Sequence, residues 1–393
     1  MEKANNTEVN IIPSVIPVTK GQNAVKTAFV LSGGGARGAY QCGVWRAVKE
    51  LGIKIDIVIG VSVGALNGAM VMQGDQTLAA NLWRELETDQ VFDVEGNAQL
   101  HDYAREFFKK GGATPTGLKT LVDKYLDESA IRASEKDFGL VTVEVPLMKP
   151  YYLWKEDIPE GQLGDYIMAS SAAFPAVHTY KIDGKDFIDG GYENNMPINM
   201  AFERGATKVI AVYLKAMGKF DPNTELVRKD DIILIEPSDD LGNFLVFDKM
   251  NTRRIMRLGY LDAMKKFEVY DGDVYSFVKG DFDKRTLKQA EAAAKIFALD
   301  KLILYRRKSF LASLLESVLT SVSELNERVN KVDFSPDSTW ELLKQFNAKN
   351  ATILIAHNII QKGDSSIFLN RYVPSFLSEQ VQAAKFLVKY GLI

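Results

Sequence analysis

The chain has 393 residues, a net charge of -3 and a single cysteine, Cys42. This length predicts two or three domains, or one large domain with an extension. The charge balance gives no indication of nucleic-acid binding, and one cysteine excludes an intrachain disulfide, which fits a reducing compartment.

The sequence predicts neither a leader nor a membrane span. Residues 1–25 are polar, contain two prolines and lack the continuous apolar core of a signal peptide, so we expect a loose tail. No apolar run reaches the roughly 18 residues that cross a bilayer. We therefore expect a soluble, cytoplasmic protein, to which a membrane surface could still present a substrate through peripheral contact.

The first elements alternate between strand and helix. A short apolar strand at 27–31 stops at three glycines and is followed by a helical pattern through Tyr40, Val44 and Val48. A second strand at 53–60 is rich in β-branched residues and leads into a second helix. This order is typical of a parallel α/β sheet.

The later elements divide the chain near residue 275. Residues 76–135 and 163–173 read as helical, and further strands are predicted at 139–145, 149–154 and 185–191 and from residues 206 and 231. From residue 285 the pattern is helical, with one short run, 351–357, that fits helix or strand. We predict a tail at 1–25, an α/β catalytic domain at 26–275 and a mainly helical region at 276–393.

A serine lies at the turn between the second strand and the second helix, in Gly60-Val61-Ser62-Val63-Gly64. A serine on so sharp a turn needs neighbours without side chains on both sides, as the G-x-S-x-G spacing supplies. The turn also places the serine at the positive end of a helix. The pattern predicts Ser62 as a nucleophile, with a purely structural turn as the alternative.

Three consecutive glycines, Gly33, Gly34 and Gly35, separate the first strand from the first helix. Backbone N–H groups exposed there can hold negative charge. The G-x-G-x-x-G spacing also fits a dinucleotide site, but that needs an acid at the end of the second strand, where the only acid is Asp56 in mid-strand. An oxyanion hole fits better, because adjacent parallel strands would bring this loop beside Ser62.

The base must come from elsewhere in the chain. None of the three histidines, His101, His178 and His357, lies in a glycine-rich or strand-end context. A carboxylate in hydrogen-bond reach can take the proton from a serine, although it is a weak base, so the oxyanion hole must supply much of the rate. Asp189, followed by two glycines at a strand end, is the best candidate; an ordinary Asp-Gly turn is the alternative.

Three motifs coincide in order and at compatible spacing: GGGARG at 33–38, GVSVG at 60–64 and DGG at 189–191. Together they resemble the signature motifs of patatin-like phospholipases. Three further segments are similar to family segments: 168–178, 193–197 and 247–263. The resemblance covers roughly residues 26–265.

The resemblance implies a three-layer α/β/α fold with a mainly parallel central sheet. It implies a phospholipase A-like hydrolase of lipid acyl esters, in which Ser62 attacks the ester and Asp189 accepts and returns the proton. The implied oxyanion site is lined by Gly33, Gly34, Gly35 and Arg37. We expect no cofactor or metal, because the sequence contains no EF-hand loop and no His–Cys cluster.

Residues 276–393 lie outside the resemblance. The segment 309–329 has an apolar stripe at helical spacing and few basic residues on its polar face. This favours packing against the catalytic domain, or against a second copy of the chain in a homodimer, over a membrane-surface helix, which is usually rich in Lys and Arg. A second amphipathic helix, more basic, is predicted at 376–393 and could touch lipid.

Two other functions stay open. An ordinary α/β-hydrolase would use a triad of Ser62, Asp189 and His357, although its serine turn follows several strands, not the second one. A non-catalytic lipid- or nucleotide-binding module would use the glycine loop, but it has no need of a serine on a sharp turn.

Overall fold

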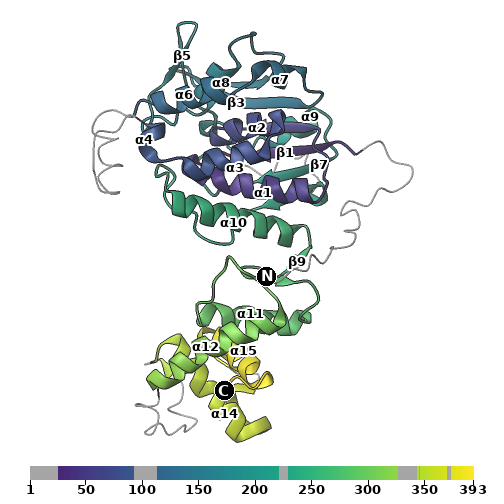
Figure 1. The fold of residues 1–393 in the computed structure, drawn as a ribbon, viewed down its shortest axis with the longest axis vertical. Coiled ribbons are helices and arrows are strands. Elements are labelled where there is room, and N and C mark those ends of the chain that lie inside the picture. The colour runs from purple at the N-terminus through teal and green to yellow at the C-terminus, as the bar shows by residue number, and fades with distance from the viewer. Residues whose placement is uncertain (1–24, 93–112, 221–228, 326–342, 345, 370–372) are drawn as a thin grey trace, which may run out of the picture. The chain divides into compact units, whose positions relative to one another are not determined.

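The computed structural model describes residues 25–92, 113–220, 229–325, 343–344, 346–369 and 373–393 (Figure 1). The chain divides into two compact units, one ending at Lys266 and the other beginning at Phe267. The sequence placed this boundary near residue 275. Of the predicted tail at 1–25, all but Val25 lies outside the described residues.

The first unit is built on an eight-stranded sheet with the order β5-β6-β3-β2-β1-β7-β8, in which β4 also pairs with β3. The neighbours from β3 to β8 in this order are parallel, whereas β4, β5 and β6 are antiparallel to their partners. The strands are β1 (Thr27–Leu31), β2 (Ile57–Gly60), β3 (Asp137–Val145), β4 (Lys149–Trp154), β5 (Tyr180–Ile182), β6 (Lys185–Asp189), β7 (Lys208–Val212) and β8 (Ile232–Ile235).

Helices cover both faces of this sheet, because successive strand residues point to opposite sides. Ala28 and Val30 pack with Met200 of α9 on one face. On the other face, Gly68 of α2 lies against Val58 and Phe138. The helices of this unit are α1 (Ala39–Glu50), α2 (Val63–Gln73), α3 (Gln76–Glu85), α4 (Thr88–Val91), α6 (Thr116–Tyr125), α7 (Glu128–Ala133), α8 (Leu163–Ser170), α9 (Ile198–Glu203) and α10 (Lys249–Lys266), with 3-10 turns η1 (Gly35–Gly38), η2 (Gly190–Tyr192) and η3 (Lys229–Asp231).

The predicted fold class is confirmed: a three-layer α/β/α unit with a mainly parallel sheet, followed by a helical region. The opening elements are strand, helix, strand and helix, and β1 and β2 are adjacent and parallel, with Ala28 opposite Ile57. The sequence analysis missed β5 and α9, which have three and six residues. Such short elements carry too few residues for a periodic pattern.

The second unit is mainly helical. Its helices are α11 (Lys284–Ile296), α12 (Arg307–Leu325), α14 (Ala348–Lys362) and α15 (Ser378–Lys389), with 3-10 turns η5 (Gly363–Ser365), η6 (Ile367–Leu369) and η7 (Ser375–Leu377). The ambiguous run at 351–357 is part of α14. The sequence analysis missed a small three-stranded sheet made of β9 (Tyr270–Asp271), β10 (Ser276–Val278) and β11 (Leu304–Tyr305).

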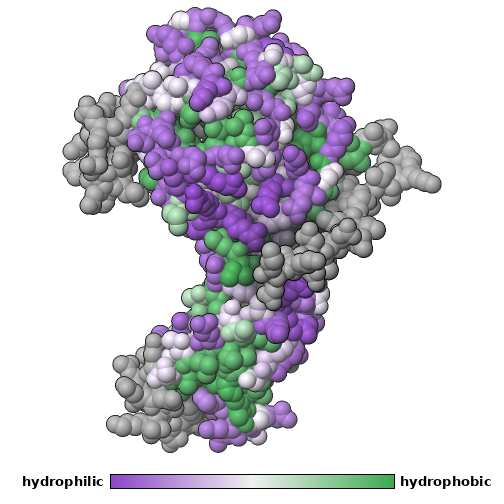
Figure 2. Space-filling view, in the orientation of Figure 1, coloured by the Kyte–Doolittle hydropathy of each residue, from purple (hydrophilic) through white to green (hydrophobic). Residues whose placement is uncertain are grey.

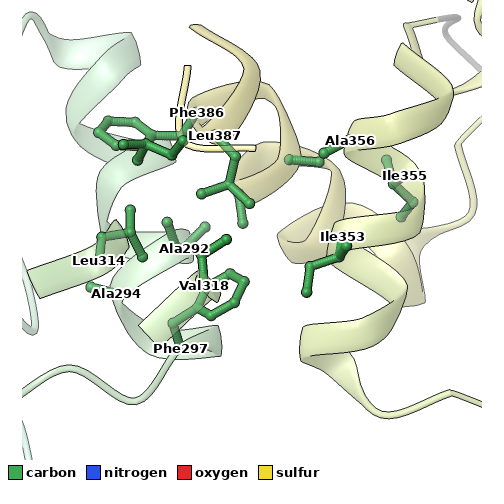
Figure 3. Packing of buried hydrophobic residues seen from close by; sticks show 14 of the residues in the cluster. Ala292, Ala294, Phe297, Leu314, Val318, Ile353, Ile355, Ala356, Phe386 and Leu387 are labelled. Atoms are coloured by element: carbon green, nitrogen blue, oxygen red, sulfur yellow. The ribbon is translucent and has the colours of Figure 1, made fainter. Parts of the chain in front are cut away.

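This second unit has its own hydrophobic core. Figure 3 shows Phe297, Val318, Ile353 and Phe386 converging from α12, α14, α15 and the end of α11. The predicted stripe of α12 is only partly covered, because Leu319 is 58% exposed, and Figure 2 shows hydrophobic side chains on the visible face of this unit. No helix within the described ranges is long and apolar enough to cross a membrane.

Candidate active site

Ser62 occupies a strained turn between β2 and α2. Its φ of 56° and ψ of -129° lie outside the regions that side chains favour, and such a backbone costs on the order of 1–3 kcal/mol, which the surroundings must supply. A Cβ on Gly60 would lie 2.1 Å from the carbonyl oxygen of Gly64, and one on Gly64 would lie 2.2 Å from that of Leu31. Both glycines are therefore needed to hold the serine in this conformation.

The strand order explains why Ser62 meets Asp189. Both β2 and β6 lie along the same edge of β3, because β4 occupies the other edge. They run toward each other: β2 ends with Gly60 opposite Leu140, and β6 ends with Asp189 opposite Thr142. Two residues of β3 span about 7 Å. The serine turn and the aspartate therefore come together where the two strands end.

The Asp189 carboxylate is buried beside the serine. It accepts a hydrogen bond from the Gly191 backbone N–H at 2.7 Å. Burial raises the pKa of Asp189 to about 6, while the nearby Ser62 hydroxyl and the Gly191 N–H oppose the rise. A Cβ on Gly190 would lie 2.0 Å from the Val141 carbonyl oxygen, so this glycine lets the strand end approach β3.

The glycine loop borders the serine as the sequence predicted, but its N–H groups are not equivalent. The Gly33 N–H donates to Asn195 Oδ1 at 2.9 Å, so it is already engaged. Among the described residues, the N–H groups of Gly34 and Gly35 donate to no partner, and both glycines line the cavity above Ser62. Gly34 and Gly35 thus have N–H groups that are available to a negatively charged group in the cavity.

Arg37 lies apart from the predicted oxyanion site. Its Nε donates to the carbonyl oxygen of Gly242 at 2.9 Å and a terminal nitrogen donates to that of Lys215 at 3.1 Å. Arg37 is not among the residues that line the cavity. Its side chain therefore ties the glycine loop to two neighbouring loops.

A cavity of about 870 Å³ opens above Ser62 and Asp189. Its walls are mainly apolar and come from α2, α3, α4, α6, α8 and the segment 173–177, with Leu66, Leu82, Leu121 and Ile167 among the side chains. Glu85 and Asp189 are the only charged residues among the described lining residues. The site can therefore hold a long hydrocarbon group beside the serine.

The histidines and Asp56 do not join this site. His357 is exposed on α14 and His178 is exposed after the cavity segment, and neither lines the cavity; His101 lies outside the described residues. Asp56 precedes β2, so it lies at the opposite end of the strand from the glycine loop, and its carboxylate accepts the Thr27 N–H. Within the described part of the chain, no cluster of three His, Cys, Asp or Glu residues could hold a metal ion.

Comparison with known proteins shows the family of this part of the chain. Residues 29–202 match the family model described as Patatin-like phospholipase, and they include the glycine loop, the serine turn and Asp189. These residues form a patatin-like phospholipase domain.

Relatives and solved structures extend the comparison. The chain is 30% identical over 289 residues to neuropathy target esterase sws of Drosophila melanogaster, covering 65% of this chain and 18% of that protein. It is 25% identical over 277 residues to lysophospholipase NTE1 of Saccharomyces cerevisiae, covering 63% and 14%. The chain thus spans less than a fifth of these relatives. VipD from Legionella pneumophila aligns with a TM-score of 0.45 and 14% identity over 94% of this chain and 92% of that chain.

Two polar residues of the patatin-like domain were missed as site residues. Ser170 is fully buried; its hydroxyl accepts the Ser62 N–H at 3.0 Å and donates to the Val141 carbonyl oxygen at 2.7 Å, which anchors the serine turn to β3. Asn195 is 1% exposed and holds Gly33. Both lie in segments, 168–178 and 193–197, that the sequence connects with the site only through the family resemblance.

Proposed function

We propose that the patatin-like domain hydrolyses lipid acyl esters with a Ser62–Asp189 dyad. The observation that carries the proposal is the position of the Ser62 hydroxyl beside a buried carboxylate, that of Asp189, with both residues lining one apolar cavity. A pair of this kind is what a serine nucleophile with a carboxylate base requires. The names of the relatives, an esterase and a lysophospholipase, support the same reaction class.

In the acylation step, Ser62 Oγ attacks the ester carbonyl carbon while its proton moves to Asp189. With a pKa near 6, Asp189 is a stronger base than an ordinary aspartate and is still about 90% ionised at pH 7. The negative charge that develops on the carbonyl oxygen is stabilised by the N–H groups of Gly34 and Gly35. When the intermediate collapses, the alcohol leaves with the proton from Asp189.

In the deacylation step, water attacks the acyl-serine. Asp189 takes the proton from that water as the new carbon–oxygen bond forms, and it returns the proton to Ser62 Oγ when the fatty acid leaves. The enzyme returns to its starting state, and the two steps need no cofactor.

The cavity favours a lipid acyl chain as the substrate group. Each methylene that leaves water for an apolar site contributes about 0.8 kcal/mol, so the apolar walls should bind longer acyl chains more tightly. Three side chains that line the cavity are also exposed: Phe174 (45%), Tyr192 (42%) and Met217 (84%). Apolar groups at the rim of such a cavity suit contact with a membrane or micelle that presents the lipid.

The test is turnover of a soluble p-nitrophenyl acyl ester. Ser62→Ala removes the nucleophile and Asp189→Asn removes the proton acceptor, so each should lower kcat by about 10³-fold or more. Ser129→Ala, on the exposed surface of α7, is the matched control and should turn over as wild type does. Wild-type turnover by folded Ser62→Ala protein would end the proposal.

A further inference from the structure

A second cleft, of about 350 Å³, lies among α1, α3 and α10 of the first unit. Four arginines line it, together with uncharged residues. Its lining residues are Cys42, Gly43, Arg46, Gln76, Thr77, Ala80, Arg84, Arg253, Met256, Arg257 and Tyr260. We call it the arginine cleft; the visible face of unit 1 that carries α1 and α3 is mainly hydrophilic (Figure 2).

The close crossing of α1 and α10 builds one side of the arginine cleft. A Cβ on Gly43 would lie 1.9 Å from the carbonyl oxygen of Met256, and one on Gly259 would lie 2.1 Å from that of Tyr40. Both glycines therefore let the two backbones touch. This contact fixes the arginines of α1 and α10 on either side of one crossing point, so their positions are built into the fold.

The guanidinium groups are oriented by stacking and by helical spacing. Arg46 of α1 lies 4.9 Å from the centre of the Tyr260 ring, and Arg257 lies 5.4 Å from it. Arg253 precedes Arg257 by one turn of α10, so both share one helix face. From α3, the small Ala80 leaves room below Arg84, four residues later on the same face.

The positive charge of the arginine cleft is poorly balanced. Arg46, Arg84 and Arg253 form no ion pair with any described residue, whereas Arg254, which does not line the cleft, pairs with Asp239. The carboxylate nearest along α1, that of Glu50, accepts a hydrogen bond from the Tyr260 hydroxyl.

The remaining polar groups of the cleft add no negative charge. The Asp75 carboxylate, next to Gln76 in the chain, does not line the cleft and caps α3 at the Leu78 N–H. Burial raises the pKa of the Cys42 thiol to about 12, so that group is neutral. The three guanidinium groups that form no ion pair with a described residue repel one another, and a bound anion would relieve that repulsion.

We propose that the arginine cleft binds the phosphate group of a phosphate ester, supplied either by a lipid headgroup or by a soluble phosphate ester. Guanidinium groups bind phosphate oxygens in pairs with fixed geometry, and they do so more strongly than a lysine ammonium does. The cleft has room for the phosphate and for the first atoms of its substituent. The site is separate from the acyl cavity, which holds no cationic residue among its described lining.

The same helix borders both sites. Leu82 and Trp83 of α3 line the acyl cavity, while Ala80 and Arg84 line the arginine cleft. A phosphate bound by Arg84 would therefore lie on the other side of α3 from the acyl cavity.

The proposal is tested by binding, without turnover. The full chain is sedimented with vesicles of ether-linked phosphatidylcholine, with and without ether-linked phosphatidic acid, and titrated with glycerol 3-phosphate by calorimetry. Arg46→Gln/Arg253→Gln removes two exposed charges of the cleft. We expect this double variant to bind at least tenfold more weakly than wild type to whichever phosphate probe wild type binds.

A matched control removes two exposed charges elsewhere: Lys149→Gln/Lys181→Gln, on β4 and β5. It should bind as wild type does. Loss of vesicle binding alone assigns the phosphate to a lipid, and loss of glycerol 3-phosphate binding assigns it to a soluble ester; either supports the site. If wild type binds neither probe, if the arginine variant binds as wild type, or if the lysine control weakens equally, the proposal is wrong. Because ether-linked lipids contain no acyl ester bond, the result is independent of the proposed esterase activity.

Discussion

Replacement of Asp189 by asparagine should stabilise the patatin-like domain at neutral pH while it removes the base. Asp189 is 7% exposed, so its charged carboxylate has lost most of its hydration. Asparagine has nearly the same shape, and its side-chain oxygen can still accept the Gly191 N–H. The substitution therefore removes a buried charge and keeps the packing around it.

The magnitude follows from the pKa of Asp189. An aspartate with a pKa of 3.8 in the unfolded chain and about 6 in the folded one costs the folded state about 3 kcal/mol at neutral pH. The direction of the pH dependence follows from proton binding. Between the unfolded and the folded pKa the folded state holds the proton more tightly, so the free energy of unfolding falls as pH rises. About 1.4 kcal/mol of this loss falls between roughly pH 5 and pH 7.5.

The assay is denaturant unfolding of wild type and Asp189→Asn at both pH values. Tryptophan fluorescence is the readout, because Trp45, Trp83 and Trp154 lie in the first unit. The introduced asparagine cannot titrate. As pH rises over this range, the free energy of unfolding of the variant should therefore increase by about 1.4 kcal/mol relative to that of wild type. Asp123→Asn, which removes a carboxylate that is 58% exposed, controls for the loss of one charge. If the wild-type and Asp189→Asn curves stay parallel with pH, the buried-base account is refuted.

Four further outcomes concern activity on a soluble p-nitrophenyl ester. Since the base must be ionised, kcat/KM should fall about tenfold per pH unit below about pH 6, and a profile flat down to pH 5 would contradict this. His357→Gln should keep kcat when its melting temperature matches wild type; a fall beyond about a hundredfold would revive the triad. Asn195→Ala should lower kcat by about tenfold or more, because the Gly33 N–H loses its acceptor; unchanged kcat would show that Gly33 needs no anchor. Asn195→Asp should also shift the acid limb of the pH profile to higher pH, since a second carboxylate disfavours the charged form of Asp189. An acid limb at the wild-type pH would contradict this.

The parts of the site that were predictable from the sequence are those that local backbone geometry dictates. Gly60 and Gly64 flank Ser62 because any Cβ there would meet a backbone oxygen at about 2 Å, and this requirement leaves a short pattern in the sequence. The adjacency of β1 and β2 follows from one strand–helix–strand unit. These two facts alone place the glycine loop beside the serine.

The remaining features depend on contacts between distant segments, which no local pattern records. The meeting of Ser62 and Asp189 requires β2 and β6 to share one edge of β3. The engagement of the Gly33 N–H by Asn195 spans 162 residues of sequence. Arg37 was assigned to the oxyanion site by motif, but its long side chain reaches the Gly242 and Lys215 carbonyl groups instead.

The most direct test of the dyad is covalent labelling with a fluorophosphonate probe, followed by mass-spectrometric mapping of the modified residue. The probe forms a stable bond only with a serine whose proton is accepted as it attacks. We expect one label on Ser62 in the wild-type chain, and loss of that label in Asp189→Asn protein that remains folded. A label on another serine, or full labelling of Ser62 in Asp189→Asn, would contradict the Ser62–Asp189 dyad.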